Sequence, residues 1–277
     1  HMHKTKLVDL AGDGRKWFAE VNDQWKGQAM CLEVEEVLFE GKSEFQDVAV
    51  FKTSTFGKMM TLDGCIQSTE RDEFAYHEMM AHVPMFSHPD PKDICIIGGG
   101  DAGVLRELLR HESLKSAVLC DIDGMVVEQS RIHLPHLAAA ASDAAESDPA
   151  RVRIIVGDGA AFLNDKEAAY DVIIIDSSDP DGPAGTLFGE EFYRKVHRAL
   201  RPGGISCSQG ECAWLHLDLM ADMAAACRRI FASAAYATIA IPTYPCGQIG
   251  MLVCAKDAAT RPQAPLRRPA EALQEKL

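Results

Sequence analysis

Hydrophobic positions along the chain change their spacing near residue 70. Before this point, apolar residues form short runs separated by turn signals such as Asp63-Gly64, a pattern typical of antiparallel hairpins. The runs predict strands at 33–40, 45–53, 58–62 and 65–68. We therefore predict a small antiparallel β domain over residues 29–69, preceded by a polar N-terminal arm over residues 1–28.

After residue 70, helical and strand-like spacings alternate. A helix is predicted over 70–86, with Pro84 limiting its far end. Further helices are predicted at 103–111, 123–131, 158–166, 188–200 and 214–231, and strands at 94–97, 117–122, 153–157, 171–176, 204–209, 237–241 and 250–255. This alternation predicts an α/β domain over residues 70–256, with helices on both faces of a mostly parallel sheet.

Two segments fall outside this pattern. The alanine-rich stretch 138–149 is interpreted as a surface insertion, and the proline-containing stretch 257–277 as a disordered tail. The insertion lies far in sequence from every motif described below, so we do not expect it to reach a functional site.

The composition limits the domain organisation, the binding partners and the cellular compartment that we expect. With 277 residues, 47% of them hydrophobic, the chain can bury a full core and form one large and one small domain. A formal net charge of −13 disfavours nucleic acid and anionic membranes as partners. Nine cysteines without a C-x-x-C pair indicate reduced thiols rather than disulfides or a zinc site. Because no apolar run is long enough to span a membrane and no secretory signal is present, we expect a soluble cytoplasmic protein.

A glycine-rich loop follows the first strand of the α/β domain. Residues 98–103, GGGDAG, satisfy the G-x-G-x-x-G pattern before a helix, where backbone N–H groups can approach a ligand. The next strand ends in Asp121-Ile122-Asp123, and an acid at this point commonly binds ribose hydroxyls. Together these features predict a site for an adenosine-containing ligand. The alternative is a tight turn with acids that cap a helix.

Asp101 inside this loop discriminates between adenosine ligands. A carboxylate there would repel the pyrophosphate of a dinucleotide, whereas it would attract a ligand with a positive group. The charge of Asp101 therefore favours a sulfonium nucleoside over NAD as the ligand, and an NAD dehydrogenase is the least favoured function. Asp158, between Gly157 and Gly159, adds an acceptor for an adenine amino group, although a helix N-cap explains it equally well.

Two further acids lie in the stretch DVIIIDSSDPDGP at 171–183. An apolar strand runs into Asp176 and Asp179 inside a loop rich in serine, proline and glycine. Acids at the carboxyl end of a strand lie where open α/β sheets place their chemistry, and they indicate a site for cations. Asp176 could instead cap the next turn, and Asp179 before Pro180 could open a turn.

Several motifs together resemble the polyamine aminopropyltransferases, with the spermidine-forming members nearest. The motifs are LDGCIQSTERDEFAYHEM (62–79), IIGGGDAGVLREL (96–108), GDGAAFL (157–163), DSSDPDGPAGTLF (176–188), QGECAWLHLD (209–218) and IPTYPCGQIG (241–250), and the resemblance covers about residues 20–256. It implies a small β domain, a Rossmann-like methyltransferase-type domain and a homodimer. The implied reaction transfers an aminopropyl group from decarboxylated S-adenosylmethionine to putrescine, giving spermidine and 5′-methylthioadenosine, with no metal or other cofactor.

The resemblance also implies roles for individual residues. Asp176 is the implied proton acceptor. The implied putrescine-binding residues are Tyr76, Asp176, Asp179, Gln209 and Tyr244. The implied nucleoside-binding residues are Gln46, His77, Gly98, Gly100, Asp101, Asp121, Asp158 and Gly159. The stretch 177–187 is the implied lid over the substrates.

Some residues keep another interpretation or depart from the family pattern. Tyr76 and Tyr244 could be packing aromatics, and Trp25 is read as a packing residue that could instead close the far end of the diamine slot. Ala102 stands where the family usually has glycine, and Asp121 replaces the more usual glutamate, which could lengthen the ribose contact.

Three other functions remain open at this point. A putrescine N-methyltransferase would use S-adenosylmethionine, a spermine-forming enzyme would accept spermidine, and a polyamine-binding subunit would have no activity. The presence of Asp101 argues against the first, and the presence of Asp176 argues against the last.

Overall fold

The computed structural model describes residues 7–178, 185, 187, 189–258 and 260 of the chain, and these residues form two β-sheets. The first sheet has the strand order β1-β2-β3-β4-β5-β6, and each neighbouring pair is antiparallel. Its strands are β1 (Leu7–Val8), β2 (Lys16–Glu20), β3 (Met30–Lys42), β4 (Asp47–Thr53), β5 (Lys58–Leu62) and β6 (Cys65–Thr69). A short 3-10 helix, η1 (Asp23–Trp25), joins β2 to β3.

The N-terminal segment is part of this sheet. Residues that we predicted as a polar arm form β1 and β2, and β2 pairs with β3 from Lys16–Val34 to Glu20–Met30. The strand has a clear alternation, because Phe18 and Glu20 are buried while Trp17 and Ala19 are more exposed. This alternation places Glu20 on the inner face of the sheet.

The second sheet is mostly parallel, with the strand order β12-β13-β11-β10-β7-β8-β9. Strands β7 to β11 pair in parallel, and the last two strands add an antiparallel edge. The strands are β7 (Asp93–Gly98), β8 (Ser116–Asp121), β9 (Val152–Val156), β10 (Tyr170–Asp176), β11 (Leu200–Gln209), β12 (Ser233–Ala240) and β13 (Gln248–Ala255). The predicted fold class, a small antiparallel sheet followed by a mostly parallel α/β sheet, is confirmed.

Helices cover both faces of the second sheet. They are α1 (Glu73–Ser87), α2 (Gly103–Leu108), α3 (Gly124–His133), α4 (Pro135–Ser147), α5 (Gly159–Phe162), α6 (Glu190–Ala199) and α7 (Leu217–Ile230), with a 3-10 turn η3 (Pro245–Gly247) before β13. Pro84 lies inside α1 instead of ending it, and α2 and α5 end earlier than predicted.

The core of the α/β unit has two layers. One layer contains side chains of α1, α2 and α4, and the other contains side chains of α5, α6 and α7. Strand β7 contributes to both, because Ile94 and Ile96 face the first layer while Cys95 and Ile97 face the second. The alanine-rich segment that we predicted as a surface insertion forms α4, which buries Ala138 and Ala141 in the first layer. Small alanine side chains allow this helix to pack closely.

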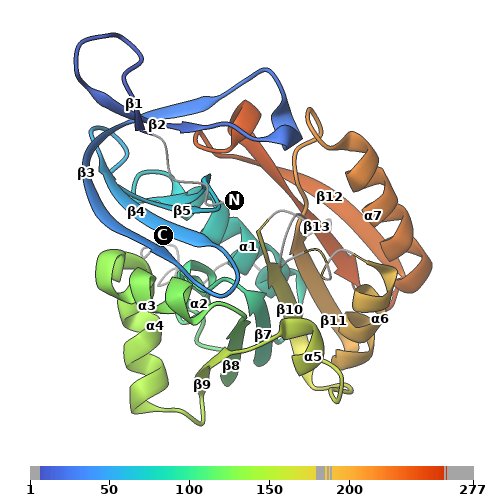
Figure 1. The fold of residues 1–277 in the computed structure, drawn as a ribbon. Helices are drawn as coiled ribbons and strands as arrows, with labels where there is room; N and C mark the ends of the chain where they lie inside the picture. Colours follow the sequence, from blue (N-terminus) through green and yellow to red (C-terminus); the bar gives the residue numbers. More distant parts are fainter. Residues whose placement is uncertain (1–6, 179–184, 186, 188, 259, 261–277) are drawn as a thin grey trace.

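The two sheets meet at the carboxyl ends of the parallel strands. In Figure 1 the N-terminal strands, in blue, lie above the second sheet, with α3 and α4 on the left and α6 and α7 on the right. Val48, Val50 and Met60 of the first sheet pack against Val126 and Leu137 of α3 and α4. The strand order of the second sheet reverses between β7 and β10, which is where open α/β sheets bind ligands. Within the described part of the chain, no helix is long and apolar enough to cross a membrane.

Candidate active site

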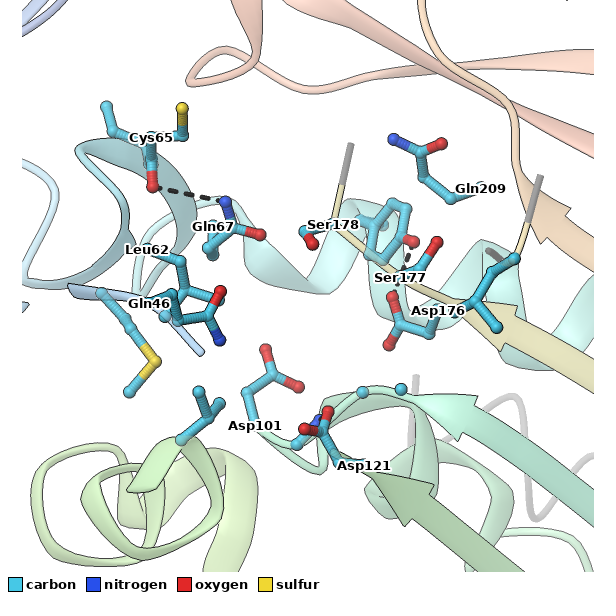
Figure 2. Close-up of a pocket in the computed structure, with 18 of the residues that line it drawn as sticks. Gln46, Leu62, Cys65, Gln67, Asp101, Asp121, Asp176, Ser177, Ser178 and Gln209 are labelled. Atoms are coloured by element: carbon cyan, nitrogen blue, oxygen red, sulfur yellow. Dashed lines mark hydrogen bonds between the residues drawn. The ribbon is translucent and has the colours of Figure 1, made fainter. Parts of the chain in front are cut away.

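A cavity of about 320 Å³ lies between the two sheets, above the ends of β7, β8 and β10. Figure 2 shows the side chains of Asp101, Asp176 and Gln46 around this common space. Every described residue that the sequence nominated lines it: Gln46, Tyr76, His77, Gly98, Gly100, Asp101, Asp121, Asp158, Gly159, Asp176, Gln209 and Tyr244. Asp179 lies outside the described residues, as do residues 180–184, 186 and 188 of the predicted lid and its flank.

The glycine loop brings the ends of two strands together. Asp176, the last residue of β10, is in register with Gly98, the last residue of β7. Gly98 has a φ of +80°, and a Cβ at this position would collide with the carbonyl oxygen of Asp176. Only glycine meets both conditions without strain. Ala102 also has a positive φ, +65°, so its departure from the family pattern keeps a left-handed conformation at a cost in free energy.

Asp176 is half-buried beside a tyrosine. The Tyr76 hydroxyl, which is positioned by α1, donates a hydrogen bond of 2.7 Å to Asp176 Oδ1. Burial and the nearby charge of Asp101 raise the pKa of Asp176 to about 6. Burial and the charge of Asp176 raise the pKa of Tyr76 well above its usual value, so the phenol remains a hydrogen-bond donor. A carboxylate with a raised pKa is a better proton acceptor than an ordinary aspartate.

The pKa of Asp101 is shifted in the opposite direction, because a chain of ionic contacts holds this carboxylate. His77 Nε2 lies 3.2 Å from Asp101 Oδ2, and His77 Nδ1 contacts Glu73, which Arg106 binds with two nitrogens at 2.9 and 3.0 Å. Burial alone would lower the pKa of His77, but Asp101 and Glu73 outweigh it and raise this pKa to about 10. Burial would likewise raise the pKa of Asp101, yet the charged imidazole lowers it. Asp101 therefore stays ionised.

The ligand atoms of His77, Asp101 and Asp176 lie within 4.8 Å of one another, the spacing of a metal site. However, both ring nitrogens of His77 already face carboxylates, so a protonated His77 has no lone pair for a metal ion. The two aspartates can instead accept hydrogen bonds from cationic N–H groups. The geometry therefore suits ammonium groups of organic ligands.

The remaining nucleoside candidates form the wall beyond the glycine loop. Asp121 accepts 2.8 Å hydrogen bonds from the N–H groups of Gly100 and Asp123, and burial raises its pKa to about 6. Asp158 caps α5 by accepting a hydrogen bond from Ala160 N at 2.8 Å, as the N-cap interpretation of this residue predicts. Asp158 also lines the cavity. Gln46 Nε2 donates to Asp123 Oδ2 at 2.9 Å and so joins the two sheets.

One residue that the sequence reasoning missed is Glu211, which is fully buried behind the cavity. Its Oε2 accepts a 2.7 Å hydrogen bond from the Tyr244 hydroxyl, and its Oε1 accepts from Gln209 Nε2 at 3.2 Å. Burial would raise the pKa of Glu211, but the neighbouring His216 ring, 3.0 Å away, and Tyr244 lower it. Glu211 thus orients two of the predicted diamine-binding side chains. Its position within the motif QGECAWLHLD was the signal that could have found it.

A second missed residue is Glu20, on the first sheet. Glu20 is 1% exposed, lines the cavity together with Trp25, and accepts a 3.1 Å hydrogen bond from Ile66 N. Burial raises its pKa to about 7, although the Ile66 N–H opposes the shift. The available signal was the alternation in KWFAE, which places Glu20 on the same face as Phe18.

Two family models match the chain. Residues 73–263 match the spermine/spermidine synthase domain, and residues 16–70 match the spermidine synthase tetramerisation domain. The two matches correspond to the α/β unit and to the N-terminal sheet. Together they extend over most of the chain.

Curated relatives and solved structures agree with these matches. Spermidine synthase of Schizosaccharomyces pombe is 47% identical over 94% of this chain and 84% of its own length, and spermidine synthase 2 of Arabidopsis thaliana is 48% identical over 91% and 72%. A spermidine synthase in complex with the transition-state analogue AdoDATO has a TM-score of 0.83 at 33% identity, covering 94% of this chain and 84% of that one. The spermidine synthase from Thermotoga maritima gives 0.82 at 32%, covering 94% and 83%. The chain belongs to the spermine/spermidine synthase family.

Proposed function

We propose that this protein is a spermidine synthase, an aminopropyltransferase that moves the aminopropyl group of decarboxylated S-adenosylmethionine to putrescine. The products are spermidine and 5′-methylthioadenosine. The observation that supports this most directly is the presence of Asp101 and Asp176 in one cavity, with pKa values shifted in opposite directions. Two anionic side chains suit a reaction in which both substrates are cations.

Asp176 performs the proton transfer in this proposal. An alkyl ammonium has a pKa near 10 by analogy with lysine, so putrescine arrives protonated and without a free lone pair. Asp176 accepts a proton from the attacking nitrogen, whose lone pair then forms the new C–N bond. The C–S bond breaks with its electrons retained by sulfur, which leaves as a neutral thioether without help from an acid. Tyr76 orients the carboxylate through its 2.7 Å hydrogen bond.

Asp101 selects the donor substrate. It binds the ammonium of the aminopropyl group, whereas the additional carboxylate of S-adenosylmethionine would meet an ionised acid and be repelled. His77 supports this role because it keeps Asp101 ionised and oriented. The nucleoside lies against Gly98, Gly100 and Gly159, with Asp121 near the ribose and Asp158 and Gln46 at its edges.

The acceptor slot extends from Asp176 towards the first sheet. Gln209 and Tyr244, held by Glu211, form one side of it, and we extend the proposal to Asp179 on the lid. Glu20 and Trp25 line the cavity from the first sheet and are suited to the second ammonium of a diamine. An acid fixed at this end would pair with the terminal ammonium of an acceptor whose length matches its separation from Asp176, and we propose that this acceptor is putrescine.

Product analysis tests the proposal directly. Purified protein is incubated with decarboxylated S-adenosylmethionine and either putrescine, cadaverine or spermidine, and the products are identified by mass spectrometry. We expect spermidine and 5′-methylthioadenosine from putrescine as the main products. Parallel incubation with S-adenosylmethionine should give no N-methylputrescine, and methylation of putrescine in that arm would overturn the donor assignment.

We also propose that the protein works in the cytoplasm as an assembly of identical chains. All nine cysteines are free thiols, which suits a reducing compartment. The match of residues 16–70 to a tetramerisation domain supports an oligomer, and we retain the expected homodimer as its basic unit. Light scattering of the purified protein tests this, since a mass of one 30.2 kDa chain would contradict it.

A further inference from the structure

The start of α1 contains an acid whose side chain is directed away from its own helix. Asp72 occupies the N-cap position, where aspartate ordinarily accepts a hydrogen bond from the first turn, but its side chain makes no such bond. One carboxylate oxygen accepts from the Thr69 hydroxyl. The other accepts from the backbone N–H of Thr243 at 2.9 Å and from its hydroxyl at 2.8 Å. The Asp72 side chain therefore does not cap α1 and instead binds Thr243, which is 171 positions away in the sequence.

Thr243 belongs to the turn that carries Tyr244. The turn is closed by backbone hydrogen bonds from Ile241 N to Gly247 O at 3.0 Å and from Gly247 N to Tyr244 O at 2.8 Å. Ile241, Thr243 and Tyr244 all line the cavity. Asp72 and Thr243 are each 4% exposed, so water does not compete for their hydrogen bonds. The position of Tyr244 therefore depends on where Asp72 holds Thr243.

The other side of this contact is the helix that carries Tyr76. Asp72 precedes Tyr76 by one helical turn, and the Tyr76 hydroxyl binds Asp176. The contact between Asp72 and Thr243 thus joins α1, which carries Tyr76, to the turn that carries Tyr244. These are the two tyrosines predicted to bind the diamine. On the donor side, Asp101 is held by His77 and by Gly103 N, and neither bond involves this contact.

We infer that Asp72 is a positioning residue for the diamine half of the cavity, acting through Thr243 to set the separation of Tyr76 and Tyr244. This inference rests on the proposed function, because it concerns the acceptor of the same reaction. If this is so, loosening the contact raises the KM for putrescine and leaves the KM for decarboxylated S-adenosylmethionine unchanged.

The test compares substitutions that differ by one hydroxyl. Thr243→Val removes the hydroxyl donor with little change of shape, and we expect the KM for putrescine to rise about fivefold to tenfold, as for loss of one buried hydrogen bond. The KM for decarboxylated S-adenosylmethionine should stay within about twofold. Thr243→Ser keeps the hydroxyl and should preserve the wild-type ratio of the two KM values.

Thr53→Val is the matched control for the general loss of a buried hydroxyl. Thr53 is also 4% exposed and donates to Gly57 O at 2.7 Å, but it lies in the first sheet away from the cavity. We expect this variant to lower the Tm while leaving both KM values unchanged. If Thr243→Val does not fold, Thr243→Ala provides the same comparison, because it also removes the hydroxyl donor and places no methyl group against the Asp72 carboxylate.

The possible results separate the two proposals. If the wild-type protein does not form spermidine from putrescine, the proposed function is wrong. If the wild-type protein is active but Thr243→Val raises both KM values equally, changes neither, or behaves like Thr243→Ser, the positioning role is overturned. A selective rise in the putrescine KM, absent from Thr53→Val, supports it.

Discussion

Asp101 and Asp176 are carboxylates of one cavity, yet their neighbours move their pKa values in opposite directions. Burial and the charge of Asp101 raise the pKa of Asp176, while the charged His77 lowers that of Asp101 despite its burial. Such separation of two nearby acids is how an enzyme assigns one as a proton acceptor and one as a fixed anion. At the residue scale, the reaction therefore depends on what surrounds each aspartate.

Removing the proton acceptor should abolish turnover. Asp176→Asn cannot take the amine proton, so we expect kcat to fall by about 10²–10⁴-fold, the usual contribution of a general base. Binding of 5′-methylthioadenosine, measured by calorimetry, should remain nearly unchanged. Asp222→Asn, which makes the same change in charge at an exposed position of α7, is the control and should be fully active. Full turnover by Asp176→Asn would contradict the assignment.

The pH dependence should report the same residue. In the proposed mechanism only the ionised form of Asp176 accepts the proton. At saturating putrescine, kcat/KM for decarboxylated S-adenosylmethionine should therefore fall as the pH drops through about 6. Tyr76→Phe removes a hydrogen bond that stabilises this carboxylate, which should raise its pKa and move the acid limb to higher pH. Tyr244→Phe loses a hydroxyl that binds Glu211 instead, and its acid limb should stay in place. An acid limb that does not move in Tyr76→Phe would disagree with this account.

At the scale of elements, the site depends on close approach between the glycine loop and its neighbours. Gly103 starts α2, and a Cβ at this position would collide with the ring of His77, which Glu73 and Asp101 hold in place. Gly124 starts α3, and a Cβ there would meet only Val156 at 3.4 Å. Two glycines at equivalent helix positions therefore tolerate a methyl group differently.

Alanine substitutions measure this difference. Gly103→Ala should displace His77 from Asp101 and raise the KM for decarboxylated S-adenosylmethionine at least tenfold, with a loss of stability of about 1–3 kcal/mol from overpacking. Gly124→Ala should be neutral or stabilise by up to about 1 kcal/mol, because alanine favours the helix. Kinetics and thermal unfolding check both. Equal behaviour of the two variants would show that the His77 contact is unimportant.

The whole molecule forms its cavity between two sheets, and each sheet contributes acids to it. Asp176 ends β10 of the second sheet and Asp101 lies in the loop after β7, whereas Glu20 reaches the cavity from β2 of the first. We therefore propose that the N-terminal sheet contributes to substrate binding, beyond any role in assembly. Neither sheet alone would enclose the acceptor slot.

Removing the charge of Glu20 should affect one substrate only. Glu20→Gln should raise the KM for putrescine about tenfold or more, since a buried charged contact is lost, and leave that for decarboxylated S-adenosylmethionine unchanged. With a pKa of about 7, Glu20 ionises as the pH rises, so the wild-type KM for putrescine should decrease from pH 6 to pH 8. Glu33→Gln, on the neighbouring β3 and half-buried, is the control. A KM for putrescine that is identical in Glu20→Gln and wild type would exclude this contact.

Patterns along the chain predicted both sheets, although not β1 and β2, and the family resemblance named twelve of the residues that line the cavity. Continuous apolar runs predicted β7 and β10, because both faces of these strands are buried, and helical spacing of apolar residues predicted α7, which buries one face. Asp101, Asp121 and Asp176 were found because the ends of parallel strands converge. The folded structure was needed to reveal the placement of Glu20, the burial of α4, and the binding of Asp72 to Thr243 instead of to its own helix. These depend on partners that are distant in sequence, and no local pattern specifies which residue a buried polar group will meet.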